Sequence, residues 1–148
     1  MGFQTEYGAQ PVSETLPRRP VWQALWRGFG GRCPSCGEGS LFRRFLKVAD
    51  HCGTCREAYY HQRADDAPPY FTIFIVGHLI LPPLMWLEMA VTPAVWVHLV
   101  IWLPLAVILT LILLPMVKGA IVALQWANRM HGFDPTSNER EAERPVEP

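Results

Sequence analysis

The middle of this sequence has almost no charge. Between Asp66 and Lys118 the only Asp, Glu, Lys or Arg residue is Glu88, although charged residues make up 18% of the whole chain. A soluble protein of 148 residues is too small to cover an uncharged stretch of this length with other residues. The lack of charge therefore argues against a buried soluble hairpin and indicates segments that cross a membrane.

The uncharged stretch divides into two apolar runs, Tyr70 to Val91 and Ala94 to Val117, which Thr92-Pro93 separates. Each run exceeds the about 20 residues that a helix needs to cross about 30 Å of hydrocarbon. Because backbone groups in lipid must be satisfied internally, we expect two helices joined by a tight turn. We assign transmembrane helices to residues 68–91 and 94–117, followed by a cytoplasmic helical extension over residues 118–131.

Basic residues are absent from the connecting turn. Nine of the 13 Lys and Arg residues precede the first run and the other four follow the second. The positive-inside rule then places both termini in the cytoplasm. The segment 1–20 lacks the apolar core of a signal peptide, so we expect none. We expect disorder in 1–20 and in the acidic tail 132–148.

Cysteine is absent except in two pairs, Cys33/Cys36 and Cys52/Cys55. The pattern C-x₂-C-x₁₅-C-x₂-C is typical of two tight turns that close a tetrahedral Zn²⁺ site, so we predict all four cysteines as ligands of a structural zinc ion. A reducing cytoplasm also favours metal-binding thiolates over disulfides. We expect a β zinc-ribbon-like head over residues 32–66, with a hairpin between Ser40 and Val48. Four nearby arginines are expected to offset the negative charge of the cluster: Arg32, Arg43, Arg44 and Arg56.

Other uses of the cysteines fit less well. Covalent haem attachment needs a histidine after the pair, but Gly37 and Arg56 follow here. A thioredoxin-like redox pair needs a βαβ unit, which the sequence does not predict. Copper remains an alternative because sulfur ligands suit Cu(I), although one pair would then be enough. Arg56 stands where a second knuckle more easily has glycine.

Catalytic motifs are also missing. The chain has no Ser/His/Asp set, no paired catalytic carboxylates and no phosphate-binding loop, so we do not expect an enzyme. Up to Asp66 there are nine basic and seven acidic residues. This small positive balance gives little attraction for nucleic acid, and a face that lies on anionic lipid headgroups fits it better.

The segment 21–31 is predicted to be an amphipathic helix. Its apolar residues Trp22, Leu25, Trp26 and Phe29 follow helical spacing, which forms one stripe. Two placements remain open. The stripe lies in the membrane interface, or it packs against the ribbon or the membrane helices.

Three polar residues within the apolar runs are candidates for a functional role. By the helical rise, Glu88 and His98 both lie about 6–8 Å from the turn, so a contact between them is geometrically natural. His78 lies about 21 Å from the turn, too deep to pair with His98. Whether the three act functionally or only structurally is left open by the sequence.

Several motifs in order resemble one known family. They are Cys-Pro-Ser-Cys-Gly at 33–37, Ser-Leu-Phe-Arg-Arg-Phe-Leu-Lys-Val-Ala-Asp at 40–50, Cys-Gly-Thr-Cys at 52–55, Trp-Leu-Glu at 86–88, Trp-Leu-Pro at 102–104 and Leu-Gln-Trp at 124–126. The chain resembles an uncharacterised bacterial family of small membrane proteins with a zinc-ribbon head, domain of unknown function 983, from about Gly31 to Trp126. The matching residues are the four cysteines, Phe42, Leu46, Asp50, Glu88, Lys118 and Gln125.

The resemblance implies a location and a role. Members of the family are chiefly proteobacterial and are often encoded beside the aa3-type terminal oxidase and its assembly factors. It therefore implies a non-catalytic accessory protein of the bacterial inner membrane that assists cytochrome oxidase biogenesis. Its expected partners are the membrane and an oxidase complex or its assembly factors, with a second copy of the chain as a further candidate. The alternative is a membrane-bound metal handler that passes copper or zinc through its cysteine pairs.

Overall fold

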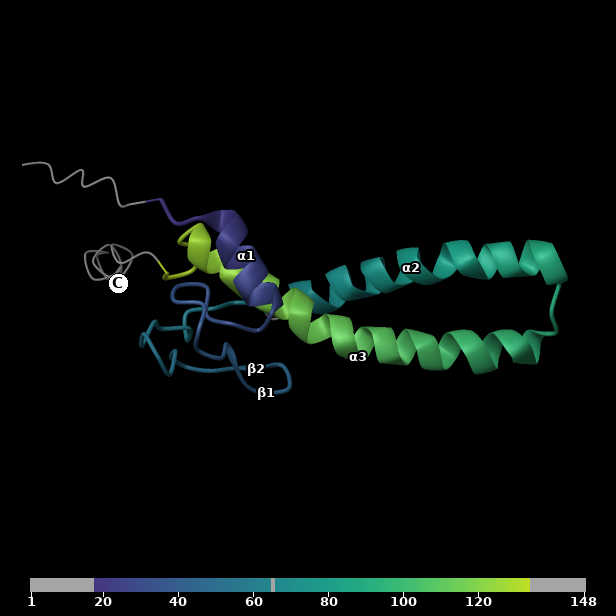
Figure 1. The fold of residues 1–148 in the computed structure, drawn as a ribbon, viewed down its shortest axis with the longest axis horizontal. Coiled ribbons are helices and arrows are strands. Elements are labelled where there is room, and N and C mark those ends of the chain that lie inside the picture. Colours follow the sequence, from purple (N-terminus) through teal and green to yellow (C-terminus); the bar gives the residue numbers. More distant parts are fainter. Residues whose placement is uncertain (1–17, 65, 134–148) are drawn as a thin grey trace, which may run out of the picture.

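A computed structural model of the protein describes residues 18–64 and 66–133. The disorder expected for 1–20 and 132–148 falls mainly on residues outside this range. In chain order the elements are α1 (Val21–Phe29), β1 (Phe42–Arg44), β2 (Lys47–Val48), α2 (Ala67–Val91) and α3 (Val95–Ala127). Figure 1 shows an elongated molecule, with the α2–α3 hairpin at one end and α1 and the β strands at the other. The expected fold class, a two-helix hairpin with a small β head, is confirmed.

The two long helices are exposed along most of their length. Their most apolar windows have a mean hydropathy of 1.7 in α2 and 2.7 in α3, and only 17% and 0% of these windows is buried. The core helix of a soluble protein would be mostly covered. Both helices are long and apolar enough to cross a membrane, so they are compatible with membrane insertion.

The turn between α2 and α3 is short. Thr92 has a left-handed backbone with φ 44°, and its N–H donates to the carbonyl of Glu88 at 3.1 Å. Pro93 follows and prevents the helix from continuing, because a residue before proline disfavours the helical conformation. The chain then reverses into α3.

The helix α3 is longer than α2, with 33 residues against 25. Counting 25 residues from Val95 along α3 reaches Gly119, so Gly119 lies at about the level of the first residue of α2. The remaining part of α3 extends beyond the hairpin into the head. The sequence predicted a span ending at Val117 and a helical extension after it, and α3 runs without a break through both as far as Ala127.

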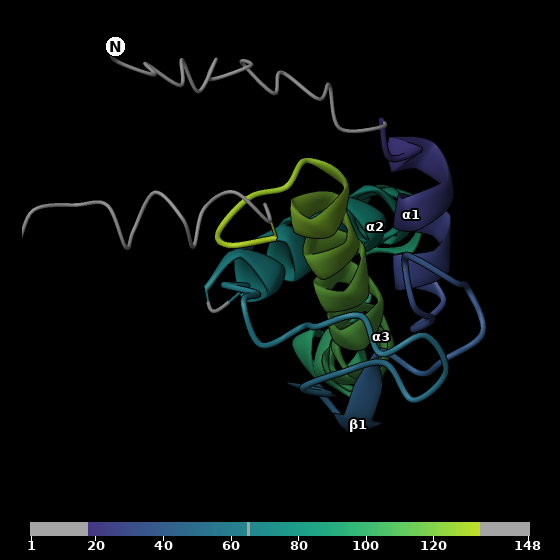
Figure 2. The same ribbon diagram turned by 90° about the vertical axis from the view of Figure 1, so that its left-hand side faces the viewer.

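The first helix packs against this extension of α3 through small residues. Ala24 and Gly28 are buried, and Figure 2 shows α1 lying alongside α3. A Cβ added to Gly28 would collide with the carbonyl of Gly119 and with the side chain of Ala123. Small residues allow the close backbone approach that is common between membrane helices.

The tryptophans of the α1 stripe stay largely outside this contact. Trp22 is 72% exposed and Trp26 is 59% exposed, because the small residues that face α3 lie beside the stripe rather than within it. The helix therefore packs on α3 and at the same time presents tryptophans outward.

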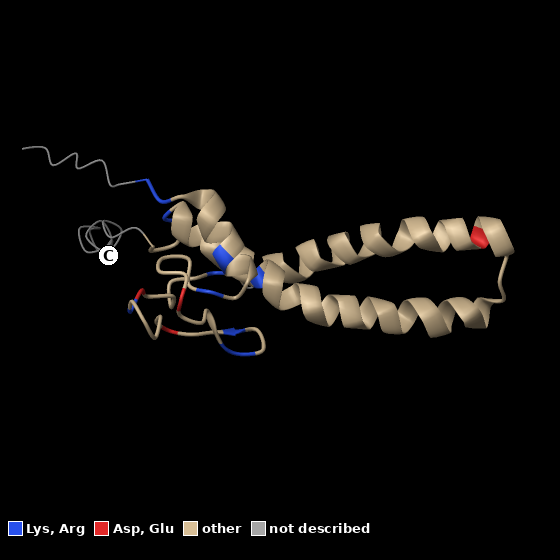
Figure 3. Cartoon of the chain, in the orientation of Figure 1, with Lys and Arg blue, Asp and Glu red and all other residues tan. Residues whose placement is uncertain are grey.

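Charge is concentrated at the head end of the molecule. Figure 3 shows the blue and red residues gathered there, with a single red residue on the hairpin, near the turn between the long helices. Between Asp66 and Lys118 the two long helices carry no other charged residue. The molecule is thus strongly asymmetric along its long axis.

The glycine contact gives a first prediction. We expect Gly119→Ala to destabilise the head by roughly 1–3 kcal/mol, because the new Cβ collides with the backbone of Gly28. The measurement is the unfolding midpoint of the purified protein in mild detergent. The matched control is Gly77→Ala on α2, where an added Cβ meets nothing within 4 Å. Equal midpoints for the two variants would contradict the close contact.

Candidate metal centre

The two cysteine pairs form two turns of the same kind. The N–H of Gly37 donates to the carbonyl of Cys33 at 2.9 Å, and the N–H of Arg56 donates to that of Cys52 at 3.1 Å. Gly37 and Arg56 both have left-handed backbones, with φ of 79° and 59°. This conformation is free for glycine and strained for arginine, so the second turn is the less relaxed of the two.

Short antiparallel pairings hold these turns in place. The N–H of Cys33 donates to the carbonyl of Gly39 at 2.7 Å, and the N–H of Cys52 donates to that of Glu57 at 2.8 Å. Between the two turns, β1 pairs with β2, with Phe42 opposite Val48 and Arg44 opposite Lys47. The hairpin therefore brings the second cysteine pair back to the first, as the sequence predicted.

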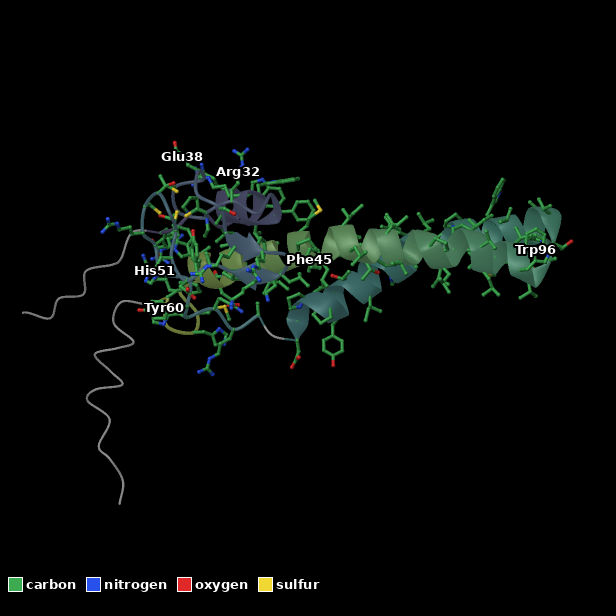
Figure 4. All side chains as sticks on the ribbon, turned by 90° about the horizontal axis from the view of Figure 1, so that it is seen from below. Arg32, Glu38, Phe45, His51, Tyr60 and Trp96 are labelled. Carbon is green, nitrogen blue, oxygen red and sulfur yellow. The ribbon has the colours of Figure 1, made fainter. Side chains whose placement is uncertain are left out.

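The four sulfurs converge in space. They lie within 4.8 Å of one another, with 3.6 Å between those of Cys33 and Cys55 and 3.7 Å between those of Cys36 and Cys52. A tetrahedral site with Zn–S bonds of about 2.3 Å has edges of about 3.8 Å. The four cysteines can therefore hold a metal ion. In Figure 4 yellow sulfur atoms lie in the head near Glu38, at the end remote from Trp96.

The backbone at Gly39 lies so close to the cluster that no side chain fits there. Gly39 is buried, and a Cβ added there would collide with the sulfur of Cys52. A glycine at this position is thus required for the sulfur to reach the centre of the cluster, which is a second sign that the residues fit a bound metal.

The environment divides the thiols into two kinds. Burial raises the pKa of Cys52, but hydrogen bonds from the N–H groups of Cys55 and Thr54 outweigh it and lower that pKa to about 6. The N–H groups of Gly39 and Glu38 lower the pKa of Cys36.

The other two thiols keep their protons more strongly. Burial raises the pKa of Cys33. Burial and hydrogen bonds with the other three sulfurs raise the pKa of Cys55 to about 12. Although Cys55 is exposed as a residue, its sulfur faces the cluster. Each turn thus supplies one readily ionised thiol, Cys36 or Cys52, and one that ionises with difficulty.

Tyr59 lies beneath the cluster, and sequence reasoning did not identify it. Its side chain is fully buried, and within the described residues its hydroxyl has no hydrogen-bond partner. Burial and the neighbouring sulfurs of Cys33 and Cys52 raise the pKa of Tyr59. The hydroxyl is therefore placed to donate to sulfur. Groups that hydrogen-bond to ligands orient them and tune metal affinity. In the sequence this residue is one of two adjacent tyrosines, Tyr59 and Tyr60, and its burial alone sets it apart.

Arg27 of α1 was also missed. Its guanidinium Nη1 donates to the carbonyls of Pro34 at 3.2 Å and Ser35 at 2.7 Å, both in the first turn. Arg43, which the sequence suggested for this purpose, instead pairs with Asp50. A positive charge that is hydrogen-bonded to the first turn thus comes from the helix that packs on α3.

The cluster is joined to α3 by a shared core. Val122 of α3 is fully buried against Cys33, Leu41, Cys52 and Tyr59. The side chain of Gln125 forms two hydrogen bonds with the backbone of Arg63, one from its Nε2 at 2.8 Å and one to its Oε1 at 3.1 Å. These contacts fix the segment after the second turn to the same helix.

Trp126, the residue after Gln125, makes further contacts with the head. The indole N–H of Trp126 donates to Glu57 at 2.9 Å, and Arg19 donates to the carbonyl of Trp126 at 2.7 Å. The Arg19 guanidinium also stacks over the Trp126 ring, 4.2 Å from its centre. The start of α1 and the segment after Cys55 therefore meet at the end of α3.

The polar residues of the hairpin lie far from the cluster. The expected contact between Glu88 and His98 is present, at 2.9 Å between Oε2 and Nε2. Trp102 donates to Nδ1 of His98 at 3.1 Å. His78 does not join them, and its Nδ1 instead lies 2.8 Å from the carbonyl of Phe74 on its own helix.

The fold and the cysteine cluster together indicate a small metal-binding membrane protein. The chain matches a family model described as "Protein of unknown function (DUF983)" over residues 42–126. The match covers more than half of the chain, so the protein belongs to this family, and the resemblance noted from its motifs is confirmed. The matched range includes Cys52, Cys55 and both long helices, and it begins just after the first cysteine pair. No curated protein and no solved structure shows significant similarity to the chain.

Removal of the tyrosine hydroxyl tests its contact with the sulfurs. We expect Tyr59→Phe to lower the affinity for Zn²⁺ about tenfold, because the hydroxyl beside two ligand sulfurs is lost while the ring stays packed. The affinity is measured by competition with a chromophoric chelator. Tyr60→Phe is the control, since Tyr60 is the neighbouring tyrosine but is 60% exposed. An unchanged affinity in Tyr59→Phe would show that the hydroxyl has no such role.

The thiol pKa values predict proton release on metal binding. Without metal at pH 7, Cys52 with a pKa of about 6 is ionised, whereas Cys33 and Cys55 carry protons. Because metal ligands must be thiolates, Zn²⁺ binding releases about two protons or more, and affinity falls as the pH is lowered. The measurement is calorimetry in buffers of different ionisation enthalpy. Release of less than about one proton would contradict the assignment of four thiolate ligands.

Proposed function

We propose that the protein is a non-catalytic accessory protein of the bacterial inner membrane whose zinc-bound head assists assembly or stability of an aa3-type terminal oxidase. The observation that carries the proposal is the shared core of the cluster and α3. Val122 belongs to the same buried core as Cys33 and Cys52. A zinc ion held by these sulfurs would fix the head rigidly to a helix of the hairpin.

Zinc fits the cluster better than copper does. Two turns of the same kind supply four sulfurs with nearly tetrahedral spacing, as in structural zinc sites. Thiolates also bind Cu(I), but a copper site would need only one of the two pairs. The buried residues around the sulfurs, among them Leu41 and Tyr59, support a structural role rather than chemistry on a substrate.

The proposed orientation follows from the charge distribution. Basic residues lie at the head end, and the turn after Val91 has none. By the positive-inside rule the head and both termini face the cytoplasm. A reducing compartment suits the free thiols of the cluster.

The proposed partner rests on the family resemblance and on the exposed hairpin. Members of the family often occur beside oxidase genes. Two helices cover each other on one side only, and the most apolar window of α3 is 0% buried. This surface is available for packing against helices of a larger membrane complex.

Transfer of metal is the second candidate. Cys55 is exposed and Cys36 is half-buried, whereas Cys33 and Cys52 are buried. One side of the cluster is therefore open, which favours exchange of metal with an acceptor.

Metal exchange separates the two candidates. For a structural zinc we expect the protein to retain equimolar Zn²⁺ during purification, with release to a chelator only as the head unfolds. The reason is that binding and folding share one free energy in such sites. The rate of zinc release is compared with the loss of head structure, followed by tryptophan fluorescence. Rapid release from a head that stays folded would favour the metal handler.

The oxidase partner is tested by a second measurement on the purified protein. Purification from native membranes in mild detergent, with mass spectrometry of the retained proteins, is expected to recover oxidase subunits or their assembly factors. Cys33→Ser/Cys52→Ser is the matched variant, and it should lose these proteins because both buried ligands are removed. Absence of oxidase proteins from the unaltered sample would refute this part of the proposal.

A further inference from the structure

The turn between β1 and β2 presents an aromatic residue that nothing covers. Phe45 and Leu46 form this two-residue turn, and Leu46 has a left-handed backbone with φ 62°. Phe45 is 60% exposed. Arg44 and Lys47 flank the turn and are themselves exposed. An exposed aromatic ring between two cations is typical of segments that enter a lipid interface.

The base of this turn lies at the boundary of the apolar hairpin. Phe42 at the start of β1 lines a groove with Phe29, Pro115 and Met116. Its ring lies 3.4 Å from the Cβ that an alanine at position 119 would have. Gly119 is level with the first residue of α2, so the strands begin where the apolar hairpin begins.

Figure 4 shows the direction in which the turn points. Along the long axis, Phe45 lies level with the start of the apolar hairpin, whereas Glu38, His51 and Tyr60 lie toward the opposite end of the head. The tip therefore extends toward the level at which lipid headgroups would surround the hairpin.

The charges of the tip are complementary to anionic lipid. Arg43 is paired with Asp50. Within the described residues no acidic partner is found for Arg44 or Lys47. Each basic residue near an anionic surface adds about 1 kcal/mol of attraction, or about fivefold in binding.

A second exposed apolar surface lies at the same level. Trp26 and Phe29 of α1 line an apolar groove with Ala120 of α3. Ala120 is the residue after Gly119, so this groove also opens at the end of the apolar hairpin. Tryptophan is favoured at the membrane–water interface. The apolar surface of the hairpin thus continues onto the head.

We propose that the head docks on the lipid surface through the β1–β2 turn, with Phe45 inserted among anionic phospholipid headgroups and with Arg44 and Lys47 in contact with their phosphates. The docking rests on the proposed insertion of the hairpin in a membrane. It holds the head in one orientation on the leaflet and leaves the cysteine turns, which lie at the other end of the head, facing water.

Photocrosslinking at three positions of equal exposure tests the docking. The photoreactive amino acid p-benzoylphenylalanine is placed at position 45, 60 or 103 of the full chain, because Phe45, Tyr60 and Leu103 are each 60% exposed. The variants are reconstituted in nanodiscs of phosphatidylcholine, alone or mixed with phosphatidylglycerol, and lipid adducts are identified by mass spectrometry. We expect adducts at position 45 in the mixed nanodiscs and none at position 60.

The basic residues provide the charge test. With the probe at position 45, Arg44→Ala and Lys47→Ala are each expected to reduce the adduct yield in the mixed nanodiscs about fivefold. Neither change should affect the yield at position 103. An equal yield at positions 45 and 60, no dependence on phosphatidylglycerol, or crosslinking of position 45 to a second copy of the chain would overturn the proposal.

Position 103 separates this proposal from the one on which it rests. It lies within α3, so adducts there report insertion of the hairpin. Adducts at 103 without adducts at 45 would retain the membrane protein and refute docking of the head. Loss of adducts at 103 as well would refute the insertion and the docking together.

Discussion

Closure of the two cysteine turns around a common centre is the constraint on which the head depends. The head has only two short strands, of three and two residues. Its buried core contains Cys33 and Cys52 among its few members. Domains this small usually need a metal or disulfides because they bury too little apolar surface. A metal ion bound there would supply folding free energy that the side chains of the head do not provide.

The helix α3 supplies the rest of that core. Three residues within less than two turns of α3 make these contacts. Gly119 lies against the backbone of α1, and Val122 lies in the same buried core as Cys33 and Cys52. Gln125 hydrogen-bonds to the backbone of Arg63. These residues belong to the same uninterrupted helix that runs through the apolar hairpin. A tilt of α3 would consequently carry the cluster with it. The head is thus joined rigidly to the hairpin rather than attached to it by a flexible linker.

Much of this arrangement was predictable because it depends on local patterns. Spacing alone predicted the convergence of the four cysteines, and the lack of charge predicted both long helices. The polar contact between Glu88 and His98 followed from equal depth beside a short turn. Arg56 was identified as less favourable than glycine at its position in the second turn, and its left-handed backbone conformation is the physical reason.

The missed features depend on contacts between distant segments. The stripe of α1 drew attention to its tryptophans, but the helix packs through Ala24 and Gly28, whose small size gives no hydrophobic signal. Tyr59 and Arg27 serve the cluster because the fold brings them to it, and nothing in their sequence neighbourhood distinguishes them from other exposed or core residues.

The two ends of the hairpin are held by different physical means. At the turn, the Trp102 indole can only donate, so Nδ1 of His98 accepts and Nε2 carries the proton that it donates to Glu88. This chain of hydrogen bonds links α2 to α3 and gives the one acidic residue of the hairpin a partner. At the opposite end, the packing of the head on α3 also holds the hairpin in place. Between these ends, among residues 18–64 and 66–133, the two helices pack on each other and each keeps one face exposed. Because both ends are fixed, that face is presented as a preformed surface, and association with other helices would not require the hairpin to rearrange.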